Sequence, residues 1–136
     1  MHRLWQGALT VRAQYHSREV DGHRLIWNVR RLVELAGDLP VVAVPLAEIR
    51  ELDEPWWVGP DTPRPTCRAF ALHAKLMAEC DLAHPIILCA DGGVMDWMHR
   101  VCKALNEGRT HVDAVRFPTT PEPDHVDVDL DELPYD

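Results

Sequence analysis

The stretch PIILCADGGVMDWMHRVCKALNEG, residues 85–108, carries the signals that decide the fold. It begins with a short β-branched apolar run, passes through Asp91-Gly92, and continues with a second short apolar run. Asp-Gly between two apolar runs is a strong signal for a β-hairpin. The apolar spacing that follows predicts a helix over about 97–107, and Gly108 supplies its C-terminal stop. The stretch therefore predicts a hairpin that leads directly into a helix.

The flanking sequence adds helix and strand signals in turn. Asn28 can cap a short helix over 28–37, and VVAVPL at 41–46 is a β-branched run too short for a helix. HVDAVRF at 111–117 is predicted to be a closing strand. From Thr66 the helical pattern returns, with one side expected to carry Phe70, His73, Ala74 and Met77. This order predicts a small α+β domain with a mixed sheet and about three helices.

The two ends of the chain differ from its middle. Residues 1–22 show no clean period and are predicted to be an N-terminal extension of a domain that spans 23–117. Residues 118–136 are acidic, contain four prolines and are predicted to be extended, either as an appendage or laid over the body.

Composition narrows the function classes. The 136 residues are 46% hydrophobic and 26% charged, as in a soluble globular protein. The net charge is -8; all 14 Lys and Arg lie in residues 1–117 with 15 acids, and the tail adds 7 acids and no base. Duplex DNA binding therefore has little support, because phosphate contacts need a basic face. No apolar run approaches a membrane span or a signal peptide, so we expect a cytoplasmic protein that does not bind membranes.

The four cysteines do not form a metal-binding pattern. They are spaced 13, 9 and 13 residues apart, without a CxxC pair, so no metal site or disulfide framework is predicted. Their neighbours favour a role as small buried core residues. These cysteines are Cys67, Cys80, Cys89 and Cys102.

The candidate site is the polar group at the start of the 97–107 helix. Asp96 is expected to be the N-cap, its carboxylate accepting the N–H of His99. His99 and Arg100 then place two cations in the first turn, where they oppose the helix dipole. Such cations make sense if they hold an anion such as phosphate together with the backbone N–H groups.

Several motifs in this order resemble the ParB/sulfiredoxin-like superfamily. VVAVPLAEI is similar to its V-x-(I/V)-P-L-x-x-I segment, and AFALHAKLMAECDLAHPIIL is similar to its helix leading into a PI-h-h strand. DGGVMDWMHRVCKALNEGRTHVDAVRF resembles its hairpin, phosphate-binding box and closing strand. The likeness covers about residues 25–117. It implies a ParB N-terminal domain-like fold, without the DNA-binding helix-turn-helix, that binds a phosphate-bearing ligand.

The resemblance assigns roles position by position. The sulfiredoxin box G-C-H-R and the ParB box G-E-R-R both fall on Trp97, Met98, His99 and Arg100. Met98 replaces the nucleophilic cysteine or the acid, so sulfinic-acid reduction and chromosome partition are not expected. The kinase-type box D-G-x-H-R keeps Asp96, His99 and Arg100, with Asp96 acting on a hydroxyl. Trp97 stands at the shared glycine, where an indole would narrow the approach of phosphate or roof the site.

The sequence therefore predicts a phosphate-ligand binding protein, with a nucleotide as the expected ligand and phosphotransfer or nucleotide hydrolysis as the candidate reaction. Mg²⁺ with a nucleoside triphosphate is the implied cofactor, and a homodimer would be compatible. Asp53 and Glu54 are candidate additional acids of the site. The alternative for these two residues is that they belong to a solvent-exposed acidic loop without a catalytic role. The alternative is a non-catalytic protein-interaction module with a degenerate site, in which the acidic tail and Trp56-Trp57 recruit a partner. A pair of adjacent tryptophans such as Trp56-Trp57 more often anchors its loop to the core.

Overall fold

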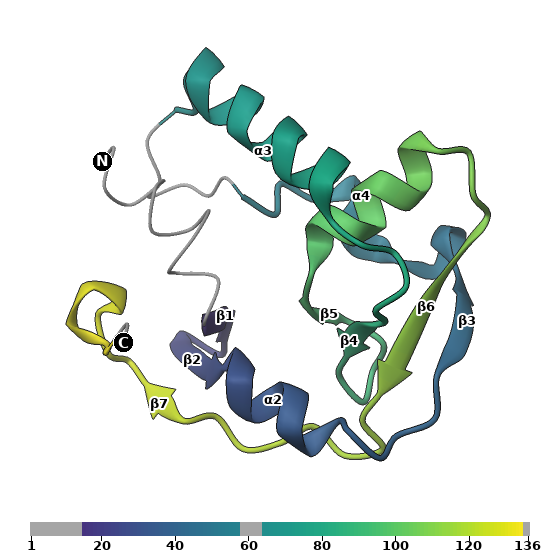
Figure 1. Ribbon diagram of the computed structural model, residues 1–136. Helices are drawn as coiled ribbons and strands as arrows, with labels where there is room; N and C mark the ends of the chain where they lie inside the picture. Colours follow the sequence, from purple (N-terminus) through teal and green to yellow (C-terminus); the bar gives the residue numbers. More distant parts are fainter. Residues whose placement is uncertain (1–14, 58–63, 135–136) are drawn as a thin grey trace.

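The computed structural model describes residues 15–57 and 64–134 (Figure 1). Two sheets and three α-helices make up this part of the chain, so the protein is a small α+β domain with one mixed sheet. Residues 1–14, which belong to the expected extension, and residues 58–63 lie outside the described residues.

The main sheet has the strand order β3-β6-β4-β5. These strands are β3 (Val42–Pro45), β4 (Ile86–Leu88), β5 (Val94–Asp96) and β6 (His111–Arg116). β4 and β5 form the predicted antiparallel hairpin, whereas β4 runs parallel to β6. In the hairpin turn, the Cys89 N–H donates to the Gly93 carbonyl at 2.8 Å, and Gly92 has φ +90°. A glycine is favoured there because that φ is strained for other residues.

Side chains of the main sheet alternate between two cores. Ile86 and Leu88 pack with one core, which also contains residues of helix α4 (Met98–Asn106). Ile87 and Cys89 pack with the other, beside helix α2 (Val29–Leu35). Because successive residues of a strand point to opposite faces, β4 is buried on both sides and must be apolar throughout. The start of α4 lies where these two cores meet.

The local helix signals are confirmed at α2. The Asn28 side chain accepts the N–H groups of Arg30 and Arg31. Helix α3 (Cys67–Glu79) begins as predicted at Thr66, whose side chain accepts the Ala69 N–H. Its predicted inner side is wrong in part, because Phe70 is 62% exposed and Ala74 is also exposed. α3 packs against α4 along a narrow seam in which Ala69 and His73 are the buried residues.

A second sheet joins the two ends of the described chain. Its order is β1-β2-β7, from β1 (Tyr15–Val20), β2 (His23–Asn28) and β7 (His125–Val126). The acidic tail is therefore laid over the body, as one of the two expected arrangements has it. Part of the expected N-terminal extension is strand β1, which is paired along its length with β2.

Burial of the cysteines is confirmed for Cys89 and wrong for Cys67, which is exposed at the start of α3. Cys80 and Cys102 are half-buried. His73, which was expected on the same side of α3 as Phe70 and Ala74, is buried. None of the described helices is long and apolar enough to cross a membrane.

Asp124 holds the tail against the start of α2. Its carboxylate accepts the Asn28 N–H at 2.7 Å and lies 3.1 Å from Nε of Arg31. We expect Asp124→Ala to lower the free energy of unfolding by about 1–2 kcal/mol, because it removes hydrogen bonds to a charged group. Urea denaturation followed by circular dichroism measures this loss. Glu122→Ala removes the same charge from an exposed position and should change stability by less than about 0.5 kcal/mol; equal losses in both variants would contradict the assignment to Asp124.

Candidate functional site

Trp97 links β5 to α4 in an unusual backbone conformation. It has φ 72° and ψ 41°, in the left-handed region, and occupies the N-cap position of α4. A bulky residue there costs roughly 1–2 kcal/mol relative to a right-handed conformation, so glycine is the residue that this position would favour. Such strain persists only where the surroundings hold it, and it occurs often at functional sites. The indole is held because it packs against both cores of the sheet.

Arg100 lies on the indole of Trp97. Its guanidinium carbon is 4.2 Å from the ring centroid, and Nη1 donates to the carbonyl of Pro85 at 3.4 Å. Nε is buried and has no hydrogen-bond partner among the described residues. Burial lowers the pKa of Arg100 below its usual value, although it stays a cation at neutral pH. The guanidinium is thus preorganised by a ring and retains hydrogen-bonding capacity.

His99 lies on a different side of α4 and does not share the contacts of Arg100. Its Nε2 is 2.8 Å from Nδ1 of His73, with which it shares a hydrogen bond. Trp57 covers both imidazoles, with ring centroids 4.6 Å from each. Burial, and then the neighbouring His73, lowers the pKa of His99 to about 4. His99 is therefore uncharged near neutral pH, and the expectation of two cations at this helix end is wrong.

Asp96 ends β5 and is not the N-cap that the sequence predicted. Trp97 occupies the N-cap position, and its side chain makes no capping hydrogen bond. Instead Oδ2 of Asp96 is buried without a hydrogen-bond partner among the described residues. Burial raises the pKa of Asp96 to about 7, against the opposing effects of the Trp97 N–H and the charge of Arg100. A carboxyl near its titration midpoint at neutral pH can either accept or donate a proton.

A cavity of about 440 Å³ opens beside Trp97 and Arg100. It lies between α2 and the segment that follows it, strands β4 and β6, and the start of α4. Its apolar walls include Val33, Ala36, Leu39, Ile87 and Val115. Asp96 pairs with Ile87 across the hairpin, which puts its Cα directly opposite a residue of the cavity wall. Concave, mostly apolar spaces with a few polar groups are the usual form of small-molecule sites.

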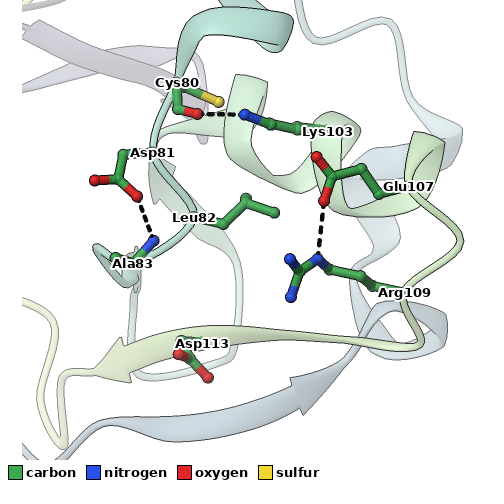
Figure 2. Close-up of a pocket in the computed structure, with 8 residues that line it drawn as sticks. All are labelled: Cys80, Asp81, Leu82, Ala83, Lys103, Glu107, Arg109 and Asp113. Atoms are coloured by element: carbon green, nitrogen blue, oxygen red, sulfur yellow. Dashed lines mark hydrogen bonds and ion pairs between the residues drawn. The ribbon is translucent and has the colours of Figure 1, made fainter.

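A second cavity, of about 450 Å³, is polar and lies at the other end of α4 (Figure 2). Lys103 donates from Nζ to the carbonyls of Ala78 and Cys80, at 3.0 and 2.6 Å, and so caps the end of α3. Arg109 is paired with Glu107 at 3.1 Å. No sequence motif marked this region, and its cations Lys103 and Arg109 are already engaged by protein groups. It is the weaker candidate for ligand binding.

The structure brings only part of the predicted site together. Trp97 and Arg100 line the 440 Å³ cavity, whereas the side chain of Met98 is buried in the core on the other face of the sheet. Asp53 and Glu54 are exposed at the end of a short 3₁₀ turn, Arg50–Asp53, and do not line the cavity.

The buried acid of that loop is Glu51, which was not among the candidate residues. Its Oε2 accepts the Val94 N–H at 3.1 Å and so anchors the loop to β5. The neighbouring Trp56 and Trp57 are partly buried against the core, which confirms that they anchor the same loop. The acidic ELDE pattern favoured a solvated loop and gave no local signal for a buried glutamate.

The described part of the chain contains no group of side chains suited to binding a metal ion. In residues 15–57 and 64–134, no three His, Cys, Asp or Glu side chains gather in a way that could hold a metal ion. Asp96 is also a poor ligand for Mg²⁺, because burial favours its protonated form and Mg²⁺ needs an ionised carboxylate. The residues present do not fit the Mg²⁺ ion that the resemblance implies.

Comparisons of the chain with profiles of protein families, with curated proteins and with solved structures find no match. The class that fold and geometry define is a small α+β domain with an apolar cavity, an indole-stacked arginine and a buried carboxyl.

Proposed function

We propose that this protein binds a small phosphate-bearing molecule, with Arg100 as the anchor for the phosphate. The observation that carries the proposal is the position of Arg100, stacked on Trp97 at the wall of a cavity and with a buried Nε that lacks a partner among the described residues. A planar guanidinium suits phosphate because it can form two parallel charge-assisted hydrogen bonds. A nucleotide is the ligand that the family resemblance implies.

Asp96 is the residue proposed to act in chemistry, if the bound phosphate ester reacts. With a pKa of about 7, its carboxyl can take a proton from an attacking hydroxyl or water near neutral pH. Arg100 would stabilise the negative charge on the phosphoryl oxygens in the transition state. His99 has no part in this step, because it lies on a different side of α4, hydrogen-bonded to His73 and covered by Trp57.

The competing function, a non-catalytic interaction module, has less support. The two tryptophans expected to recruit a partner make contacts within the fold instead. Trp57 covers His73 and His99, and Trp56 stacks on His16 with ring centroids 5.7 Å apart. The tail is bound to the body through Asp124 and β7.

The test is ligand-dependent thermal stabilisation. Wild type, Arg100→Ala and the control Arg30→Ala are heated with inorganic phosphate, ATP, CTP or GTP, with and without Mg²⁺. A ligand at 100 times its Kd should stabilise wild type and Arg30→Ala by about 2.7 kcal/mol, a shift of several degrees. Arg30 is an exposed arginine on α2, so its loss should leave binding unchanged. No shift with any phosphate compound, or equal shifts in Arg100→Ala, would rule out the proposed site.

A further inference from the structure

We infer that the preferred ligand is a phosphate monoester whose ester group is an apolar aryl or branched alkyl group, rather than a nucleotide. This inference rests on the proposed function and names its ligand class. It is based on the apolar walls of the 440 Å³ cavity beside Arg100, because a phosphate group alone has no use for apolar side chains.

The size of the cavity calls for a group beyond phosphate. One water molecule occupies about 30 Å³ of liquid, and sites for drug-sized ligands begin at about 300 Å³. A cavity of about 440 Å³ therefore has room for an organic group in addition to an anion. Since Arg100 lies at its wall next to Trp97, a phosphate bound by the guanidinium would direct its ester group into this space.

The chemistry of the walls selects an apolar group. The lining side chains from α2, β4 and β6 are Val33, Ile87 and Val115, and the segment after α2 adds Ala36 and Leu39. Among the lining residues, the charged or titratable side chains are His84 and Arg100. A nucleobase buried here would leave most of its ring and exocyclic polar atoms without partners, and each such atom costs about 1–3 kcal/mol. An aryl or alkyl group has no polar atoms to leave without partners, and burial of its apolar surface makes binding more favourable.

The rim of the cavity is also apolar. Val33 and Val41 line the cavity and yet are 42% and 56% exposed, so they border its opening to solvent. Exposed aliphatic side chains at the mouth of a pocket favour the approach of an apolar group. The charge is complementary too, because Arg100, which also lines the cavity, provides a cation for the phosphate.

The experiment compares phenyl phosphate, inorganic phosphate and cytidine monophosphate by calorimetric titration of the full chain. Phenyl phosphate should bind wild type at least tenfold more tightly than either of the others. Val33→Trp should fill the cavity from its exposed rim and remove this preference. The control Leu35→Trp adds the same indole to the same helix, at a position that is 49% exposed and outside the cavity lining, and should keep the preference. Val41→Trp, at the position just before β3, repeats the comparison with the control Val42→Trp at the first residue of β3.

The outcomes separate the inference from the proposed function. If inorganic phosphate or cytidine monophosphate binds as tightly as phenyl phosphate, with Arg100→Ala abolishing binding, the inference is overturned and the proposed function stands. The same holds if both tryptophan variants that line the cavity keep the wild-type preference. If none of the three compounds binds wild type, the proposed function fails and the inference fails with it.

Discussion

Replacing Trp27 with alanine should lower the free energy of unfolding by about 3–5 kcal/mol, the range found when large buried aromatic residues are truncated. Trp27 is 2% exposed and packs in the core on the α2 side of the main sheet. Its Nε1–H donates to the Pro121 carbonyl at 2.8 Å, so the same side chain also fastens the tail. The free energy of unfolding of a small domain is about 5–15 kcal/mol in total, so the variant should be close to unfolding.

Trp27 also contacts two side chains of the neighbouring strand β1. The imidazole of His16 lies 5.6 Å from the indole, centroid to centroid, and burial lowers the pKa of His16 to about 3, so the imidazole is neutral. The guanidinium of Arg18 lies 5.5 Å from the indole. Removing the indole therefore opens a space that several side chains share.

Equilibrium unfolding in urea measures the loss, with Trp27→Phe as the matched control. Phenylalanine keeps an apolar ring and removes the Nε1 donor, so we expect a smaller cost of about 1–2 kcal/mol. If Trp27→Ala were within 1 kcal/mol of wild type, the β1-β2-β7 sheet would not depend on packing against the main sheet.

The elements that the sequence predicted correctly have local causes. Asn28 caps its own helix, Asp91-Gly92 turns its own hairpin, and Gly108 ends α4 with φ +77°. In each case the deciding residue lies within a few positions of the structure that it sets. The spacing of apolar residues in the 85–108 stretch is also local information.

The first hairpin was missed although its turn has the same chemistry. Asp21 and Gly22 have φ 52° and 82°, as a two-residue type I′ turn requires. Strands β1 and β2 flank this turn, so Asp-Gly was an available signal. Strand β7 could not be predicted in this way, because its two residues are set by pairing with β2, about 100 residues earlier in the chain.

Two residues of the predicted site, Trp97 and Arg100, lie together at a cavity, but the charge state of the group was not predicted. His99 loses its charge because Trp57 and His73, which lie far away in the sequence, cover it. Burial by distant residues is not visible in a local motif, and the charge of a histidine depends on it.

Asp96→Asn should change the pH dependence of stability more than the substitutions at Asp124, Glu122 or Asp113. Burial raises the pKa of Asp96 from 3.8 to about 7 in the folded protein. The folded state therefore binds this proton more tightly than the unfolded state, and wild-type stability should fall as pH rises from about 4 to about 7. Below that window the carboxyl is protonated in both states, and above it the cost is constant.

The expected size of this effect is on the order of 4 kcal/mol, at about 1.4 kcal/mol for each pH unit of the window. Asparagine has the same shape and no charge, so the stability of Asp96→Asn relative to wild type should increase between pH 4.5 and pH 8. Urea unfolding at both pH values measures that difference. Asp113→Asn, an exposed position on β6, is the control, and its difference from wild type should stay constant because its side chain remains in solvent. A difference between Asp96→Asn and wild type that does not change with pH would show that Asp96 is ionised in the folded protein throughout this range, which would remove it as the proposed base.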